Sequence, residues 1–140
     1  MKQLSKYLIL LIVAVLGVTS CGSDEPDGMW ERMKWTNVND LMNVNGVYIL
    51  PEENGTYTFL CRNYEQPWFT SFTVNGVQQT VSDNHSISGD WWFTAKFEGN
   101  KLLITVGTLP KSVDSRDFTL NVTAGDIFDS LIFRQERGAY

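Results

Sequence analysis

Histidine and cysteine are scarce in this chain of 140 residues, which contains one histidine and two cysteines. So few histidines and cysteines argue against a zinc site with several protein ligands and against a disulfide framework. Basic residues are fewer than acidic ones: the chain has 11 Lys and Arg and 16 Asp and Glu, which gives a formal net charge of -5. A nucleic-acid-binding protein needs a basic face to displace counterions from phosphates. We therefore expect no nucleic-acid partner.

An apolar run long enough to span a bilayer is also missing. Lys2 and Lys6 precede one unbroken apolar stretch, residues 8–18, whereas a transmembrane helix needs about 20 apolar residues. A short basic segment followed by a short apolar one is typical of an export signal. The stretch leads into Val18-Thr19-Ser20-Cys21, which resembles the lipobox of bacterial lipoproteins.

The lipobox resemblance implies that residues 1–20 are a signal peptide and that Cys21 carries a lipid anchor after cleavage. Two or more acyl chains hold a protein stably on a membrane, whereas one chain binds only marginally. The acidic residues just after Cys21 resemble the surface-export signal of Bacteroidetes lipoproteins, which implies an outer-membrane protein exposed at the cell surface. The alternatives are a periplasmic orientation, or an ordinary signal peptide with a chance cysteine nearby.

The rest of the chain divides into a tether and a β-domain. Residues 21–40 begin with a polar, acidic stretch without hydrophobic periodicity, which predicts a flexible tether. Residues 41–140 show short segments of alternating apolar and polar residues, separated by turn residues, and no amphipathic helix. Asn75-Gly76, between two such segments, predicts a hairpin with a type I′ turn. About seven strands predict an all-β, immunoglobulin-like sandwich, with an eight-stranded barrel as the alternative.

The last two predicted strands carry a family signal. Arg116 begins the penultimate strand, the turn Ala124-Gly125-Asp126 follows, and the final strand closes on Phe133-Arg134-Gln135. Together with Trp92-Phe93-Thr94-Ala95, this pattern resembles the BACON domain, the Bacteroidetes-associated carbohydrate-binding, often N-terminal family. The resemblance covers roughly residues 44–135 and implies a seven-stranded immunoglobulin-like sandwich associated with glycan-degrading systems.

The residue patterns do not predict catalysis, a cofactor or a bound metal. Cys61 shares its strand face with aromatic residues, which predicts a buried thiol, and the single histidine, His85, lies in a polar loop. The carboxylates stand at turns and strand ends instead of forming the convergent pair of a glycosidase. Oxygen-bearing side chains at residues 83–90 are of the kind that bind calcium, and the polarity of a loop explains them as well.

Aromatic residues are the stronger functional signal. They make up 13% of the chain and include five tryptophans. Exposed rings on small β-domains can stack against the apolar faces of sugars. Trp91 and Trp92 are adjacent and must point to opposite sides of a strand. Alternation assigns Trp91 to the core, so we expect Trp92 to be exposed, with Trp68 and Tyr64 as further contacts in a shared platform. The opposing interpretation is that these rings cap the ends of the sandwich.

The sequence therefore predicts a cell-envelope lipoprotein that is not an enzyme, with two hypotheses for its role. The first is a binding module that holds a glycan or mucin through Trp92, Trp68 and Tyr64. The second is a structural or interaction module that joins an envelope protein partner through an edge strand, without binding a glycan.

Overall fold

The computed structural model describes residues 30–138, which form two β-sheets and no helix. The predicted signal peptide, Cys21 and the start of the predicted tether lie outside these residues. Within the described range, no helix is available that could cross a bilayer. In chain order the strands are β1 (Trp35–Asn37), β2 (Met42–Val44), β3 (Val47–Leu50), β4 (Gly55–Cys61), β5 (Trp68–Val74), β6 (Val77–Thr80), β7 (Ser86–Gly89), β8 (Phe93–Glu98), β9 (Lys101–Val106), β10 (Ser115–Thr123) and β11 (Phe128–Glu136).

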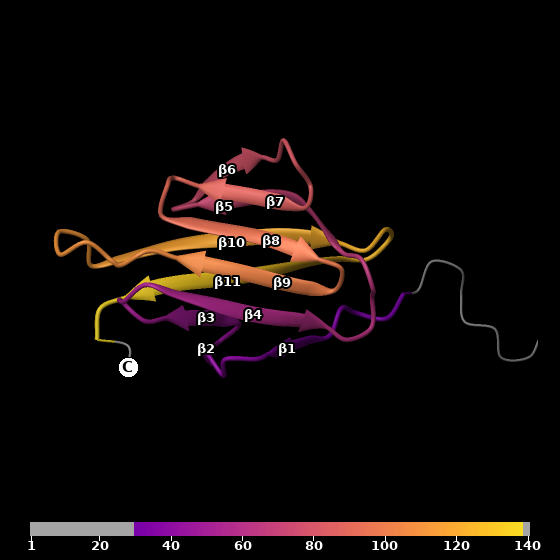
Figure 1. Ribbon diagram of the computed structural model, residues 1–140, viewed down its shortest axis with the longest axis horizontal. Helices are drawn as coiled ribbons and strands as arrows, with labels where there is room; N and C mark the ends of the chain where they lie inside the picture. The colour runs from indigo at the N-terminus through magenta and orange to yellow at the C-terminus, as the bar shows by residue number, and fades with distance from the viewer. Residues whose placement is uncertain (1–29, 139–140) are drawn as a thin grey trace, which may run out of the picture.

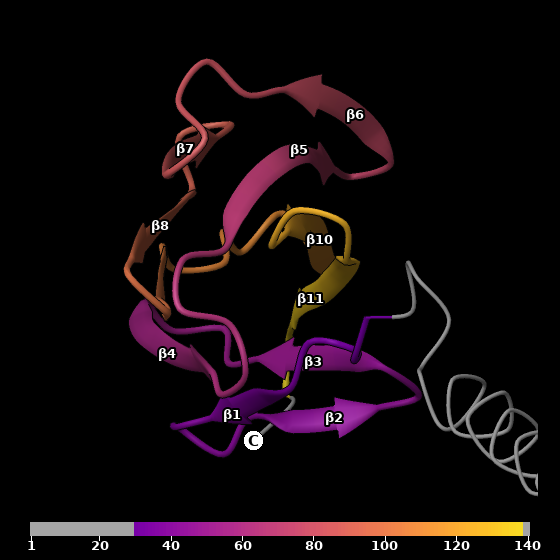
Figure 2. The same cartoon turned by 90° about the vertical axis from the view of Figure 1, so that its right-hand side faces the viewer.

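The strands pack as a sandwich. One sheet has the order β1-β4-β9-β8-β7 and the other has the order β2-β3-β11-β10-β5-β6. Figures 1 and 2 show the sheets as facing layers, with β8 and β9 over β10 and β11. Within their sheets, β4-β9-β8 and β5-β10-β11 have the orders B-E-D and C-F-G of immunoglobulin domains. The predicted all-β sandwich is confirmed, and the barrel alternative is wrong because each sheet ends in edge strands.

Asparagine–glycine turns determine two of the hairpins. Asn75 and Gly76 have φ angles of 46° and 84°, and they join β5 to β6 so that Val74 pairs with Val77. A type I′ turn needs a positive φ at both central residues, and glycine adopts it without strain. The predicted hairpin is thus confirmed. A second turn of the same kind, Asn45-Gly46, joins β2 to β3.

The structure corrects the predicted strand count and the domain boundary. Residues 30–138 contain eleven strands instead of about seven. One reason for the larger count is that the turn Asn45-Gly46 divides residues 42–50 into two short strands, β2 and β3. The folded domain also begins before residue 41, because β1 pairs with β4 and Met33 is buried in the core. These short segments join the sheets through backbone pairing, which hydrophobic alternation does not reveal.

The core is formed by the inward-facing side chains of both sheets. Alternate residues of β8, β9 and β10 are buried. Phe118 lies at the centre without exposed surface, and its ring stacks on Phe93 and Phe133 with centroid distances of 3.9 Å and 4.9 Å. Such aromatic pairs contribute about 0.5–1.5 kcal/mol beyond the burial of their area. The ring of Phe118 therefore connects the two sheets.

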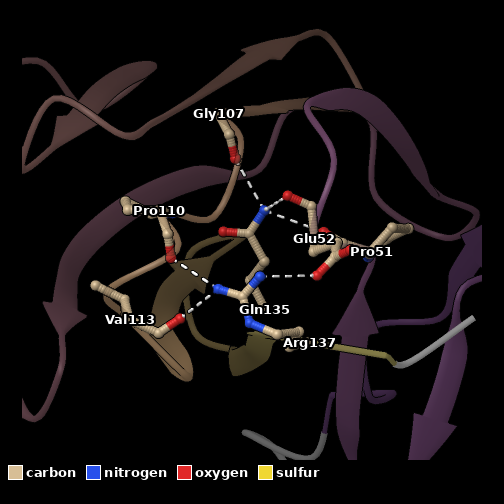
Figure 3. A network of polar contacts seen from close by, with 7 residues as sticks. All are labelled: Pro51, Glu52, Gly107, Pro110, Val113, Gln135 and Arg137. Atoms are coloured by element: carbon tan, nitrogen blue, oxygen red, sulfur yellow. Dashed lines mark hydrogen bonds and ion pairs between the residues drawn. The ribbon is translucent and has the colours of Figure 1, made fainter.

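A buried polar network around Gln135 closes one end of the sandwich. The Gln135 side-chain amide donates to the carbonyl oxygens of Pro51 at 3.0 Å and Gly107 at 2.8 Å (Figure 3). Its Oε1 accepts a hydrogen bond from Arg116 Nε at 2.7 Å. Arg116 and Gln135, which carry the family resemblance, thus join segments that are far apart in the sequence.

Arg137 fastens the end of β11 to the same region. Its Nη2 donates to the carbonyl oxygens of Pro110 at 2.8 Å and Val113 at 2.9 Å, and its Nη1 lies 3.2 Å from a carboxylate oxygen of Glu52 (Figure 3). This ion pair is exposed, so it contributes less than about 1 kcal/mol. The two carbonyl contacts mainly fix the path of the long loop between β9 and β10.

Candidate functional site

The turn between β7 and β8 places a tryptophan where the chain elsewhere uses glycine. The Trp92 backbone N donates to the Gly89 carbonyl at 3.2 Å, and the central residues Asp90 and Trp91 have φ angles of 47° and 58°. This is the type I′ pattern of the two asparagine–glycine turns. A bulky residue with positive φ is an outlier that costs about 1–2 kcal/mol. Backbone strain of this kind is concentrated at functional sites.

The Trp91 side chain is displayed to solvent beside a groove. It is 90% exposed, and it borders a groove of about 410 Å³ on the outer face of the five-stranded sheet. Thr56, Thr105 and Thr94 pair across β4, β9 and β8 in one row that lines this groove. The Thr56 and Thr105 hydroxyl oxygens are 3.4 Å apart. Among the described residues, those that line the groove carry no charge, so it offers an aromatic ring and a row of hydroxyls.

Trp92 and Arg116 support the backbone beneath Trp91. The Trp92 side chain is buried, and the Arg116 guanidinium lies 4.2 Å from the centroid of its ring. The backbone carbonyl of Trp92 accepts a hydrogen bond from the Gly107 backbone N at 2.8 Å. Arg116 Nη2 donates to the Gly107 carbonyl at 3.1 Å. Burial lowers the pKa of Arg116 from its ordinary value. A desolvated cation–π contact contributes about 2 kcal/mol. These contacts hold Trp92 in place and thereby fix the backbone from which the exposed Trp91 ring projects.

The structure reverses the predicted exposure of the tryptophan pair. Trp92 is buried, and the exposed ring is that of Trp91. The prediction assumed a strand that starts at Trp91, but β8 begins at Phe93, and Trp92 is an extra residue between the turn and the strand. Trp92 and Phe93 are therefore both buried. Gly89-Asp90, two turn-forming residues directly before the pair, are the sequence signal for the later strand start.

The other two predicted contact residues lie away from Trp91. Trp68 begins β5, is half-buried, and pairs with Thr123 at the far end of β10 from Arg116. Tyr64 is half-buried, packs against the core, and donates its hydroxyl to a backbone carbonyl near the N-terminal end of the domain. The predicted platform that unites Trp92, Trp68 and Tyr64 is therefore wrong.

The remaining candidates for chemistry are separated in the fold. Cys61 is buried and His85 is exposed in its loop, so both predicted environments are confirmed. Within residues 30–138, no three His, Cys, Asp or Glu side chains gather as a metal site would require.

Comparison with known structures identifies a relative. The chain is similar to a protein from Bacteroides thetaiotaomicron whose structure was determined by NMR, with 30% sequence identity and a TM-score of 0.70 over 86% of this chain and 99% of that chain. The chain belongs to the family of that protein. This chain thus shares the fold of the Bacteroides thetaiotaomicron protein over nearly the full length of that protein.

More remote similarities are to two titin domains. The M1 domain of titin aligns at 12% identity and a TM-score of 0.47, over 78% of this chain and 97% of that domain. Titin domain M7 aligns at 10% identity and a TM-score of 0.42, over 79% of this chain and 100% of that domain. No protein-family model and no curated protein matches the chain.

Proposed function

We propose that the protein is a non-catalytic module that binds carbohydrate through Trp91 and the groove beside it. The observation that carries the proposal is the 90% exposure of Trp91 at a strained turn position. Glycine would fit this turn without strain, so the fold itself does not need a tryptophan there. A ligand that covers the ring explains the side chain, and Trp92 supports the site instead of contacting the ligand.

The lining of the groove favours a neutral sugar. The apolar face of a sugar ring can pack on the Trp91 indole, while Thr56, Thr94 and Thr105 offer hydroxyls that both donate and accept hydrogen bonds. A volume of about 410 Å³ is within the usual range for small-ligand sites. The groove lacks a cation among its described lining residues and the chain has a net charge of -5, so acidic sugars are disfavoured. The resemblance to BACON domains supports the same ligand class.

Replacing Trp91 by alanine should weaken binding at least tenfold, because the variant loses the stacking surface and keeps the fold. Isothermal titration against neutral hexose oligosaccharides, xylo-oligosaccharides and mucin O-glycans measures the effect. Trp30→Ala is the matched control, since Trp30 is 54% exposed and does not line the groove. Equal affinity of Trp91→Ala and the wild type, or no heat with any glycan in the panel, would contradict the proposal.

Trp91→Gly should be more stable than the wild type although it loses binding. Removing the side chain relieves the strain of a positive φ, and the added freedom of the unfolded chain offsets part of that gain. We expect the free energy of unfolding to rise by about 0.5–1 kcal/mol in urea denaturation. Trp91→Ala retains a Cβ and should gain less. A Trp91→Gly variant that is less stable than Trp91→Ala would show that the turn is not strained.

The proposed module is lipid-anchored through Cys21 at the outer membrane and faces outward. The support is the lipobox sequence and the acidic residues that follow it. Growth of the producing cells with a clickable fatty acid should label the wild-type protein, and Cys21→Ala should abolish the label and release the protein from membranes. Cys61→Ala is the control, because that thiol is buried. External protease treatment of intact cells then tests outward exposure.

A second function, attachment to an envelope protein partner, is favoured by the edge of the six-stranded sheet. β2 is the edge strand there, and its residues Met42 and Val44 are 46% and 48% exposed. Uncharged edge strands can accept an added strand from a partner. Cross-linking in cells should then recover one stoichiometric partner, and Val44→Lys should abolish its recovery. Recovery of the protein alone argues against this function.

A further inference from the structure

A second polar row lies on the outer face of the six-stranded sheet. Ser71 on β5, Asn121 on β10 and Ser130 on β11 are in register. Asn121 Nδ2 donates to Ser71 Oγ at 2.9 Å, and Ser130 Oγ donates to Asn121 Oδ1 at 2.7 Å. This polar row lines a groove of about 500 Å³, whose wall includes the 69% exposed ring of Phe128.

The two serines of the polar row have hydrogen-bonding capacity left for a ligand. Ser71 Oγ accepts the bond from Asn121 and retains its own proton to donate, while Ser130 Oγ donates to Asn121 and retains its lone pairs. The side-chain amide of Asn121 bonds one serine through its Nδ2 and the other through its Oδ1, and it thereby orients both hydroxyls. The sheet thus presents a donor and an acceptor at fixed positions.

A bulge places aromatic residues beside the polar row. The pairing of β10 with β5 shifts register between Asn121 and Val122, which leaves Thr70 as the extra residue. Bulges redirect side chains and are common next to functional sites. Across the shift, Trp68, Thr123 and Phe128 are in register. The apolar residue Phe128, together with the half-buried Trp68, therefore adjoins the row of hydroxyl and amide groups.

We infer that this face is a second binding site, which takes a neutral sugar residue separately from the Trp91 groove. The ring of Phe128 would pack on the sugar, and Ser71 and Ser130 would bond its hydroxyls. The lining includes one carboxylate, Asp129, and no cation among the described residues, which disfavours anionic ligands. Asp129 is oriented by the Trp35 indole, whose Nε1 donates to its Oδ2 at 2.9 Å.

The two grooves are well separated. Phe128 begins β11, whereas Gln135, which bonds the Gly107 carbonyl at the Trp91 groove, is seven positions further along the strand. At about 3.3 Å per residue, these positions are roughly 23 Å apart along β11. The grooves also lie on opposite sheets. One copy of the protein can therefore hold two segments of glycan, which raises apparent affinity for a polymer above that for a short oligosaccharide.

Two-dimensional ¹⁵N NMR titration tests the second site directly, because the Asn121 side-chain amide is a reporter at its centre. The probes are maltohexaose, cellohexaose and xylohexaose, with a polygalacturonate oligomer as the acidic comparison. We expect a neutral probe to shift the Asn121 amide and the backbone signal of Phe128, and the acidic probe to leave them unmoved. Phe128→Ala should weaken this response at least fivefold, whereas Val77→Ala, exposed on the edge strand β6, should not change it.

The outcomes separate the two sites. Trp91→Ala should abolish only the response around the first groove, and Phe128→Ala only the response around Asn121. If no neutral probe moves the Asn121 amide, or if it moves only with the acidic oligomer, the second site is wrong, whatever happens at Trp91. If the Asn121 amide of the wild type responds to a neutral probe while the residues around Trp91 respond to none, the second site stands and the proposed function of Trp91 fails.

Discussion

Arg116→Met should lower the free energy of unfolding by about 3–5 kcal/mol. The Arg116 side chain donates to Gln135 Oε1 and to the carbonyls of Gly107 and Thr108. Methionine fills a similar volume but leaves these acceptors short of donors, and it removes the cation–π contact with Trp92. Each buried acceptor that loses its partner costs about 1–3 kcal/mol. Urea denaturation followed by circular dichroism measures the change.

Arg134→Met is the matched control for this experiment. Arg134 is exposed on β11 one residue from Gln135, and its contact with Glu136 is a surface pair at 3.9 Å. Its removal should change stability by less than about 0.5 kcal/mol. In a double-mutant cycle, Gln135→Leu should destabilise strongly by itself and much less in the Arg116→Met background, because the pair shares one network. Equal effects of Arg116→Met and Arg134→Met would contradict a structural role for the buried guanidinium.

Phe118→Ala should destabilise the protein by about 3–5 kcal/mol. The Phe118 ring has no exposed surface and lies between Phe93 and Phe133, with the Trp92 ring at 5.4 Å. Alanine loses the transfer free energy of the ring and leaves a cavity that rigid neighbouring strands cannot close. The variant should also weaken the glycan binding proposed for Trp91, because the Trp92 ring loses its contact with Phe118.

Phe128→Ala is the corresponding control, since the same substitution is made at a ring that is 69% exposed. It should change the free energy of unfolding by less than about 0.5 kcal/mol. Calorimetric melting of both variants checks the contrast, and Phe118→Leu should recover part of the loss because it fills part of the cavity. A loss below about 1 kcal/mol for Phe118→Ala would show that the two sheets do not depend on this ring.

Much of the fold follows from local patterns in the sequence. Alternation along residues 118–122 predicts a strand with one buried face, and the structure buries Phe118, Leu120 and Val122. Asn75-Gly76 predicts a type I′ hairpin because few other residue pairs accept two positive φ angles. Cys61 is predicted in the core by its aromatic neighbours on the strand and is buried. Each of these features depends on residues within a few positions of one another.

The site is where local patterns fail. Alternation assigned Trp91 to the core, and a single extra residue before β8 exchanged the roles of Trp91 and Trp92. Hydrophobic alternation has a period of two residues and does not reveal an inserted residue. The predicted faces of the residues before the insertion are therefore reversed, which is what happens at Trp91. The polar row Ser71-Asn121-Ser130 joins β5 to the β10–β11 hairpin, which follows it only after four other strands, and the pairing beside the row is shifted by the bulge at Thr70.

By itself, the sequence determined the class of the fold, the positions of the tight turns and the inward faces of the long strands, because these depend on side-chain period and backbone stereochemistry over a few residues. Only the tertiary structure decided which tryptophan meets solvent, how Arg116 and Gln135 join distant loops, and which hydroxyls align across the sheets. Those features depend on strand order and register, which are set by the packing of two whole sheets against each other.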